Sequence, residues 1–168
     1  MLTVIIAVLG FILDRVAKIF AKVVVEPAGS IVVIKNFFSF TYVENRGAAH
    51  GILQGGRWPL SIITIIVCTA IIIFLVKKYS KMPTLLRVSA GLILAGGIGN
   101  LVDRLFLGYV IDMMEITFIE YPVFNPADNM LVIGTILLGL YILFFDKGLF
   151  FGEKKTQTDS EKDNNGDK

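Results

Sequence analysis

Four long apolar segments constrain this 168-residue chain more than any other feature. They run from about 1 to 21, from 58 to 76, from 85 to 107 and from 129 to 145. A helix needs roughly 20 apolar residues to cross the hydrocarbon core of a bilayer, and each segment approaches that length. Because 55% of the residues are hydrophobic and only 18% are charged, too little polar surface remains for a soluble domain. The sequence therefore predicts a mainly helical membrane protein with four transmembrane helices.

A cleaved secretory signal peptide is the alternative interpretation of the first apolar segment. Such a peptide carries basic residues before its apolar run, whereas this segment carries Asp14, Arg15 and Lys18 within the run. We therefore interpret residues 1–21 as a retained helix.

The lysine and arginine residues predict the orientation of the helices, because cytoplasmic loops carry an excess of them. Four lie around the loop between the second and third segments, and five follow the fourth segment, whereas the two opposite loops share four. Both termini and residues 77–87 are therefore predicted to be cytoplasmic, and residues 22–57 and 108–128 to face outward. Residues 1–151 are expected to form a single membrane domain, followed by a polar, disordered cytoplasmic tail over 152–168.

The outward-facing segments have their own structural signals. Residues 30–43 are rich in β-branched and aromatic side chains, so we expect two short strands and a small extracytoplasmic β-sheet there. The later outer segment contains Tyr121-Pro122 and Asn125-Pro126. A proline disfavours the helical conformation of the residue before it. A short outer segment is therefore predicted between the third and fourth helices.

Charged side chains within a membrane helix are costly, so each one needs a physical reason. Asp14 and Lys18 stand four residues apart on one helix face, where they either neutralise each other or contribute to substrate binding. At the end of the third segment, we expect Arg104 to neutralise Asp103 or to order a nearby loop. Asp103 is then a poor catalytic acid, and Asn100 on the same face can hydrogen-bond a neighbouring helix.

Small residues accompany two of these polar positions. Ala95 and Gly99 form a small-xxx-small pattern, which suits close packing of helices. Asn45 precedes Gly47, where another backbone could approach closely, although the local pattern alone favours an ordinary turn.

Composition argues against several kinds of site. The net charge is only +2, and the basic residues are not interleaved with aromatic residues, so no nucleic acid partner is expected. Cys68 is the only cysteine and His50 the only histidine, so the chain has no cluster with the spacing of metal ligands. Neither a Ser–Lys nor a Ser–His arrangement stands out.

Two aspartates remain as the best chemical candidates, Asp112 and Asp128, each beside a predicted outer helix end. Two aspartates held close together share a proton, so one can act as a base and the other as an acid. Spacing alone supports this pair only weakly, because Asp128 could instead be the N-cap residue of the fourth helix.

Five short blocks follow one another along nearly the whole chain. They are Asp14-x-x-x-Lys18, Asn45-Arg-Gly-Ala-Ala49, Gly96-Gly-Ile-Gly-Asn-Leu-Val-Asp-Arg104, Val110-Ile-Asp112 and Phe124-Asn-Pro-Ala-Asp128. In their order, their spacing and the four predicted helices, residues 2–146 resemble the lipoprotein signal peptidases (signal peptidase II) of bacteria.

The resemblance implies a membrane-embedded aspartic endopeptidase whose catalytic dyad is Asp112 and Asp128, at the outer face of the bacterial cytoplasmic (inner) membrane. It implies cleavage of prolipoproteins before a diacylglyceryl-modified cysteine, without a metal or organic cofactor, and inhibition by globomycin-type cyclic peptides. We expect a multi-pass monomer that meets its substrate in membrane lipid. The matched positions that would bind substrate or support the site are Asp14, Lys18, Asn45, Asn100, Asp103, Arg104 and Asn125.

Some positions depart from the commoner family pattern, namely His50, Met113, Pro126 and Asn129. None removes a carboxylate, so they bear on the shape of the pocket and on inhibitor sensitivity. Two other hypotheses stay open: a transporter with Asp14, Asp103 and Asp112 as proton relay groups, and a non-catalytic assembly factor. The clustering of carboxylates at predicted outer helix ends argues against a relay across the membrane.

Overall fold

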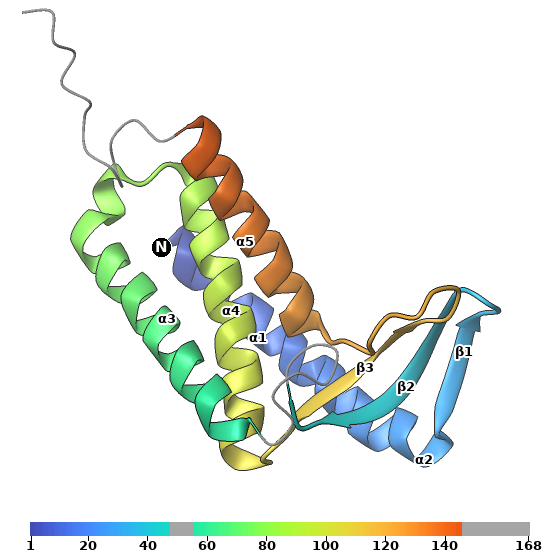
Figure 1. Ribbon diagram of the computed structural model, residues 1–168. Coiled ribbons are helices and arrows are strands. Elements are labelled where there is room, and N and C mark those ends of the chain that lie inside the picture. Colours follow the sequence, from blue (N-terminus) through green and yellow to red (C-terminus); the bar gives the residue numbers. More distant parts are fainter. Residues whose placement is uncertain (48–55, 146–168) are drawn as a thin grey trace, which may run out of the picture.

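The computed structural model describes residues 1–47 and 56–145. Over these residues, four long helices form a bundle, and a three-stranded antiparallel sheet projects sideways from one end of it (Figure 1). The long helices are α1 (Leu2–Phe20), α3 (Arg57–Lys78), α4 (Thr84–Phe106) and α5 (Pro126–Phe144). The strands are β1 (Ser30–Ile34), β2 (Phe38–Asn45) and β3 (Val110–Ile116). His50 and the predicted tail at 152–168 lie outside the described residues.

The predicted helices agree with the observed ones to within a few residues. The helical path that starts with α1 continues further than expected, through a π-helical segment (Ala21–Val25) into the short helix α2 (Glu26–Ala28). A 3-10 turn (Tyr79–Lys81) follows α3 and leads into α4. The bundle is thus built from the four apolar segments that the sequence predicts.

Helix α4 forms the centre of the bundle, because α1, α3 and α5 all pack against it. Small residues permit these close contacts. A Cβ atom at Gly99 would lie 2.7 Å from Asp14 Oδ2 of α1, and one at Gly10 of α1 would lie 2.8 Å from the Ala95 side chain. The small-xxx-small prediction is therefore confirmed. On the next face of α4, a Cβ at Gly96 would collide with the carbonyl oxygen of Ala127 in α5.

Among the described residues, three helices are long and apolar enough to cross a membrane: α3 with its 3-10 turn, α4 and α5. Helix α1 has 19 residues, but it also carries the three charged side chains noted above. Asp14 and Lys18 are buried, whereas Val8, Ile12 and Val16 are exposed. The charged groups of α1 thus face the bundle, and its outward side is apolar.

The sheet has the order β1-β2-β3, and β1 and β2 are the two predicted strands. Strand β3, which pairs antiparallel with β2, is not among the predicted strands. In this register Asp112 lies opposite Val43, and Val110 lies opposite Asn45. The third strand therefore brings the end of β2 beside a candidate catalytic aspartate.

Candidate active site

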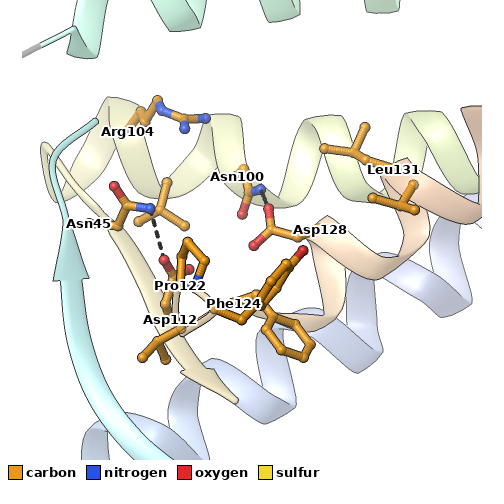
Figure 2. Close-up of a pocket in the computed structure, with 12 residues that line it drawn as sticks. Asn45, Asn100, Arg104, Asp112, Pro122, Phe124, Asp128 and Leu131 are labelled. Atoms are coloured by element: carbon orange, nitrogen blue, oxygen red, sulfur yellow. Dashed lines mark hydrogen bonds between the residues drawn. The ribbon is translucent and has the colours of Figure 1, made fainter. Parts of the chain in front are cut away.

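A pocket of about 260 Å³ lies where the sheet, α4 and the start of α5 meet (Figure 2). Five of the nine predicted site residues line it, and they come from four separate elements. They are Asn45 of β2, Asn100 and Arg104 of α4, Asp112 of β3, and Asp128 of α5. Residues 121–124 and the apolar side chains of Val110, Leu131 and Val132 complete the wall.

Asp112 is buried, and both of its carboxylate oxygens accept hydrogen bonds from amide side chains. Asn125 Nδ2 donates to Oδ1 at 2.6 Å, and Asn45 Nδ2 donates to Oδ2 at 2.9 Å. Burial, followed by the nearby charge of Asp128, raises the pKa of Asp112 to about 7, although the two amides oppose this shift. Asp112 can therefore change its protonation state near neutral pH.

Asp128 is held by the first turn of α5. Asn125 is the N-cap residue: its Oδ1 accepts from the Asp128 backbone N–H at 3.0 Å, and Asp128 Oδ2 accepts from the Asn125 backbone N–H at 3.1 Å. The alternative that Asp128 is the N-cap is therefore wrong. The other carboxylate oxygen, Oδ1, accepts from Asn100 Nδ2 at 2.7 Å (Figure 2).

Asn125 joins the two candidate carboxylates. Its side chain donates to Asp112, while its backbone N–H donates to Asp128. The same Nδ2 also lies 3.2 Å from Asn100 Oδ1, so the amide groups form a connected network. Because Asn125 is fully buried, this network has little freedom to rearrange.

A cluster of four charged side chains lies behind this network, and we call it the ionic cluster: Asp14, Arg15, Lys18 and Asp103. Arg15 Nη2 lies 2.6 Å from Asp14, and Arg15 Nη1 lies 2.7 Å from Asp103. Lys18 Nζ lies 3.1 Å from Asp14 and 2.7 Å from Asp103. The predicted pair of Asp14 and Lys18 is therefore confirmed, as part of a larger arrangement.

The predicted neutralisation of Asp103 by Arg104 is wrong, because Asp103 pairs with Arg15 and Lys18 instead. Consecutive helix residues do not face each other, so Asp103 points to α1 while Arg104 points elsewhere. Arg104 lines the pocket, and its Nη2 donates to the Gly47 carbonyl at 3.4 Å, which agrees with the alternative that it orders a nearby segment.

Some parts of the site were not singled out from the sequence. Arg15 was visible only as one of three charges in an apolar segment, and its two carboxylate partners come from different helices. The apolar wall residues Leu131 and Val132 carry no signal that separates them from other apolar residues. Among the described residues, no group of three or more His, Cys, Asp or Glu side chains is arranged to hold a metal ion.

Three of the unusual positions can be located. Met113 is buried and packs with Ala21 and Ile111, and Pro126 occupies the first turn of α5, where its missing N–H is not needed. Asn129 Nδ2 lies 3.9 Å from Met114 Sδ. None of these side chains lines the pocket.

Comparison with known proteins adds independent information. Residues 6–144 match the family described as Signal peptidase (SPase) II. The chain is 41% identical to the lipoprotein signal peptidase of Clostridium acetobutylicum over 146 residues, covering 85% of this chain and 94% of that protein. It is 42% identical to the lipoprotein signal peptidase of Halothermothrix orenii over 139 residues, covering 82% and 92%. A solved bacterial membrane enzyme has a TM-score of 0.77 at 35% identity, with 84% of this chain and 87% of that chain covered.

Proposed function

Because the chain belongs to the signal peptidase II family of membrane proteases that process lipoprotein signal peptides, we propose that it is an aspartic endopeptidase. Its substrate is a prolipoprotein, which it cleaves before a diacylglyceryl-modified cysteine. Asp112 and Asp128 form the catalytic dyad, and the other predicted site residues position them or contact the substrate. Residues 1–151 form the catalytic membrane domain.

The observation that carries this proposal is the connection of both carboxylates through Asn125. One buried residue donates to Asp112 and to Asp128, and both carboxylates line the same pocket. The charge of Asp128 also raises the pKa of Asp112, which supports a pair that shares one proton near neutral pH.

The dyad acts on a water molecule in the pocket. The ionised aspartate takes a proton from this water, and the water oxygen attacks the carbonyl carbon of the scissile peptide bond. The protonated aspartate then gives its proton to the leaving amine nitrogen as the C–N bond breaks. The dyad thereby regains one shared proton, and no metal or organic cofactor takes part.

Further observations support the proposed membrane topology, in which α1 crosses the membrane together with α3, α4 and α5. Its outward side is apolar, and its N-terminal amino group donates to the Tyr79 hydroxyl at 2.6 Å, next to the loop predicted to be cytoplasmic. The sheet lies at the opposite end of the bundle (Figure 1), and residues of β2 and β3 line the pocket. Both termini are thus cytoplasmic, and the site lies at the outer face of the bacterial inner membrane.

The wall of the pocket suits a lipid-modified substrate. Val132 lines the pocket and is also 55% exposed on the outer surface of α5, so the pocket reaches the side of a membrane-crossing helix. A substrate that diffuses within the bilayer can therefore approach from the side. We expect the enzyme to act as a monomer and to be inhibited by globomycin-type cyclic peptides that occupy the pocket.

The decisive experiment measures cleavage of a diacylglyceryl-cysteine precursor by the purified enzyme in lipid, with and without globomycin. Asp112→Asn and Asp128→Asn should each lose cleavage by about a thousandfold or more, equivalent to about 4 kcal/mol in the barrier. Glu120→Gln is the matched control, since Glu120 is an exposed carboxylate midway between the two in sequence. Wild-type rates in either Asn variant would exclude the dyad, and proton flux without proteolysis would favour a transporter.

A further inference from the structure

The ionic cluster balances two carboxylates against two cations beside the proposed dyad. Asp14, Lys18 and Asp103 are almost completely buried, and the side chain of Arg15 is only 25% exposed. Without Arg15, two buried carboxylates would share the single charge of Lys18. Buried charges that lack a partner are costly, so the balance constrains all four groups.

Lys18 connects this cluster to the candidate active site. Its ammonium group has three N–H donors and meets three acceptors: Asp14 Oδ2, Asp103 Oδ2, and Asn100 Oδ1 at 2.9 Å. Because Asn100 Oδ1 accepts a hydrogen bond from Lys18 Nζ, the Nδ2 group of Asn100 is directed to Asp128. Lys18 and the Asn125 amide, which also donates to Asn100 Oδ1, together decide which end of the Asn100 amide faces Asp128.

Arg15 contacts both carboxylates that compete with Asn100 for Lys18. Its Nη2 reaches Asp14 Oδ2 and its Nη1 reaches Asp103 Oδ1, while Nη2 also donates to the Gly99 carbonyl at 2.8 Å. The guanidinium is thus fixed between α1 and α4. No other described residue donates to Asp103 Oδ1.

We propose that Arg15 is a positioning residue for the dyad. By neutralising one of the two buried carboxylates, it leaves Lys18 free to orient Asn100 and keeps excess negative charge away from Asp112 and Asp128. This inference rests on the proposed function, because it concerns how the same two aspartates are held and charged.

The charges that act on the dyad come from three directions. Lys18 of α1 and Arg104 of α4 each act on both aspartates, and the charge of Asp128 acts on Asp112. Arg15 reaches the pair only through the cluster. A change at Arg15 should therefore shift the pH dependence of cleavage without removing a group from the pocket.

The test compares cleavage over a range of pH for Arg15→Gln, Arg15→Lys, Asp14→Asn and the double variant Arg15→Gln/Asp14→Asn. Arg15→Gln leaves the cluster with a net negative charge, so the pH profile should move to higher pH. Its kcat should fall about tenfold, because Asn100 and Asp128 are held less firmly. Its KM should change less than about twofold, because no substrate contact is lost.

The other variants separate charge from packing. Asp14→Asn leaves a net positive charge and should move the profile to lower pH, whereas Arg15→Lys keeps the charge and should keep the wild-type profile. The double variant restores neutrality and should return the profile towards that of the wild type. Thermal unfolding of each variant in detergent identifies any that has lost its fold.

Two outcomes would overturn the inference: a wild-type pH profile in Arg15→Gln, or equal shifts in Arg15→Gln and the double variant. Either result leaves the dyad assignment intact, since that depends on Asp112→Asn and Asp128→Asn. If those two variants cleave normally, the proposed function is wrong, whatever the result for Arg15→Gln. If Arg15→Gln does not fold, the direction of the shift in Asp14→Asn and the return in the double variant still decide the question.

Discussion

The four aspartates of the ionic cluster and the candidate active site fall into two pairs that are held in different ways. Asp14 and Asp103 face the cations Arg15 and Lys18 in the ionic cluster. Asp112 and Asp128 instead accept hydrogen bonds from neutral amide groups. Both pairs lie within one connected network, with Asn100 between them.

The difference lies in the partners of the carboxylates, which are full positive charges for one pair and neutral amide groups for the other. A cation beside a buried carboxylate favours its ionised form, which suits a structural role. An amide donor supports a buried carboxylate without a full opposite charge, so protonation stays accessible. The pKa of about 7 for Asp112 follows from burial and from Asp128, with amides too weak to offset them.

The largest expected effect comes from removing a cation from the ionic cluster. Lys18→Met keeps the length of the side chain but leaves Asp14 and Asp103 with Arg15 alone. Breaking a buried ion pair costs about 3–5 kcal/mol, so the variant should unfold at a much lower temperature in detergent. Lys22→Met is the control, because Lys22 is about half exposed, and its melting temperature should stay near that of the wild type.

Asp112 of the amide-supported pair should make the stability of the protein depend on pH. Because folding raises the pKa of Asp112 from 3.8 to about 7, the stabilisation from its neutral form is complete below about pH 3.8 and is lost as the pH rises to about 7. Asp112→Asn removes this dependence. The unfolding free energy of the variant relative to the wild type should therefore be higher at pH 8 than at pH 5, by up to about 3 kcal/mol. The melting temperatures of the two proteins at each pH measure this difference.

Asp112→Asn also loses one amide hydrogen bond, since a single carbonyl oxygen replaces two acceptors. The comparison across pH cancels this constant loss. An equal difference between variant and wild type at both pH values would contradict a raised pKa for Asp112.

The contrast between the pairs also explains what could be predicted from sequence. The apolar segments and the small residues of α4 predict the bundle because their signals are local. The partners of Asp103 could not be inferred in this way, since they depend on how α1 packs against α4 at Gly99. Strand β3 was missed because its residues gain a partner only when β2 lies alongside them. The resemblance to a family predicted the site residues, but the connection through Asn125 required the structure.

A smaller effect should follow from disturbing the helix contact that carries the ionic cluster. A Cβ at Gly99 would lie 2.7 Å from Asp14 Oδ2, so Gly99→Ala must displace α1 or the carboxylate. Overpacking of this kind costs about 1–3 kcal/mol, which thermal unfolding in detergent can measure. At Gly139 of α5 no described atom lies within 4 Å of an added Cβ, so Gly139→Ala should be neutral or slightly stabilising. Equal effects of the two substitutions would show that the contact is not tight.

The smallest expected effect concerns a single amide donor to the candidate dyad. Asn45 Nδ2 donates to Asp112 Oδ2 and thereby lowers the pKa of Asp112 against the effect of burial. Asn45→Ala removes a hydrogen bond worth about 1 kcal/mol, so the pKa should rise by somewhat less than one unit. The acidic limb of the pH profile for cleavage should move to higher pH by this amount. A shift to lower pH would mean that Asn45 supports the neutral form of Asp112, and that the two pairs of aspartates differ less than their partners suggest.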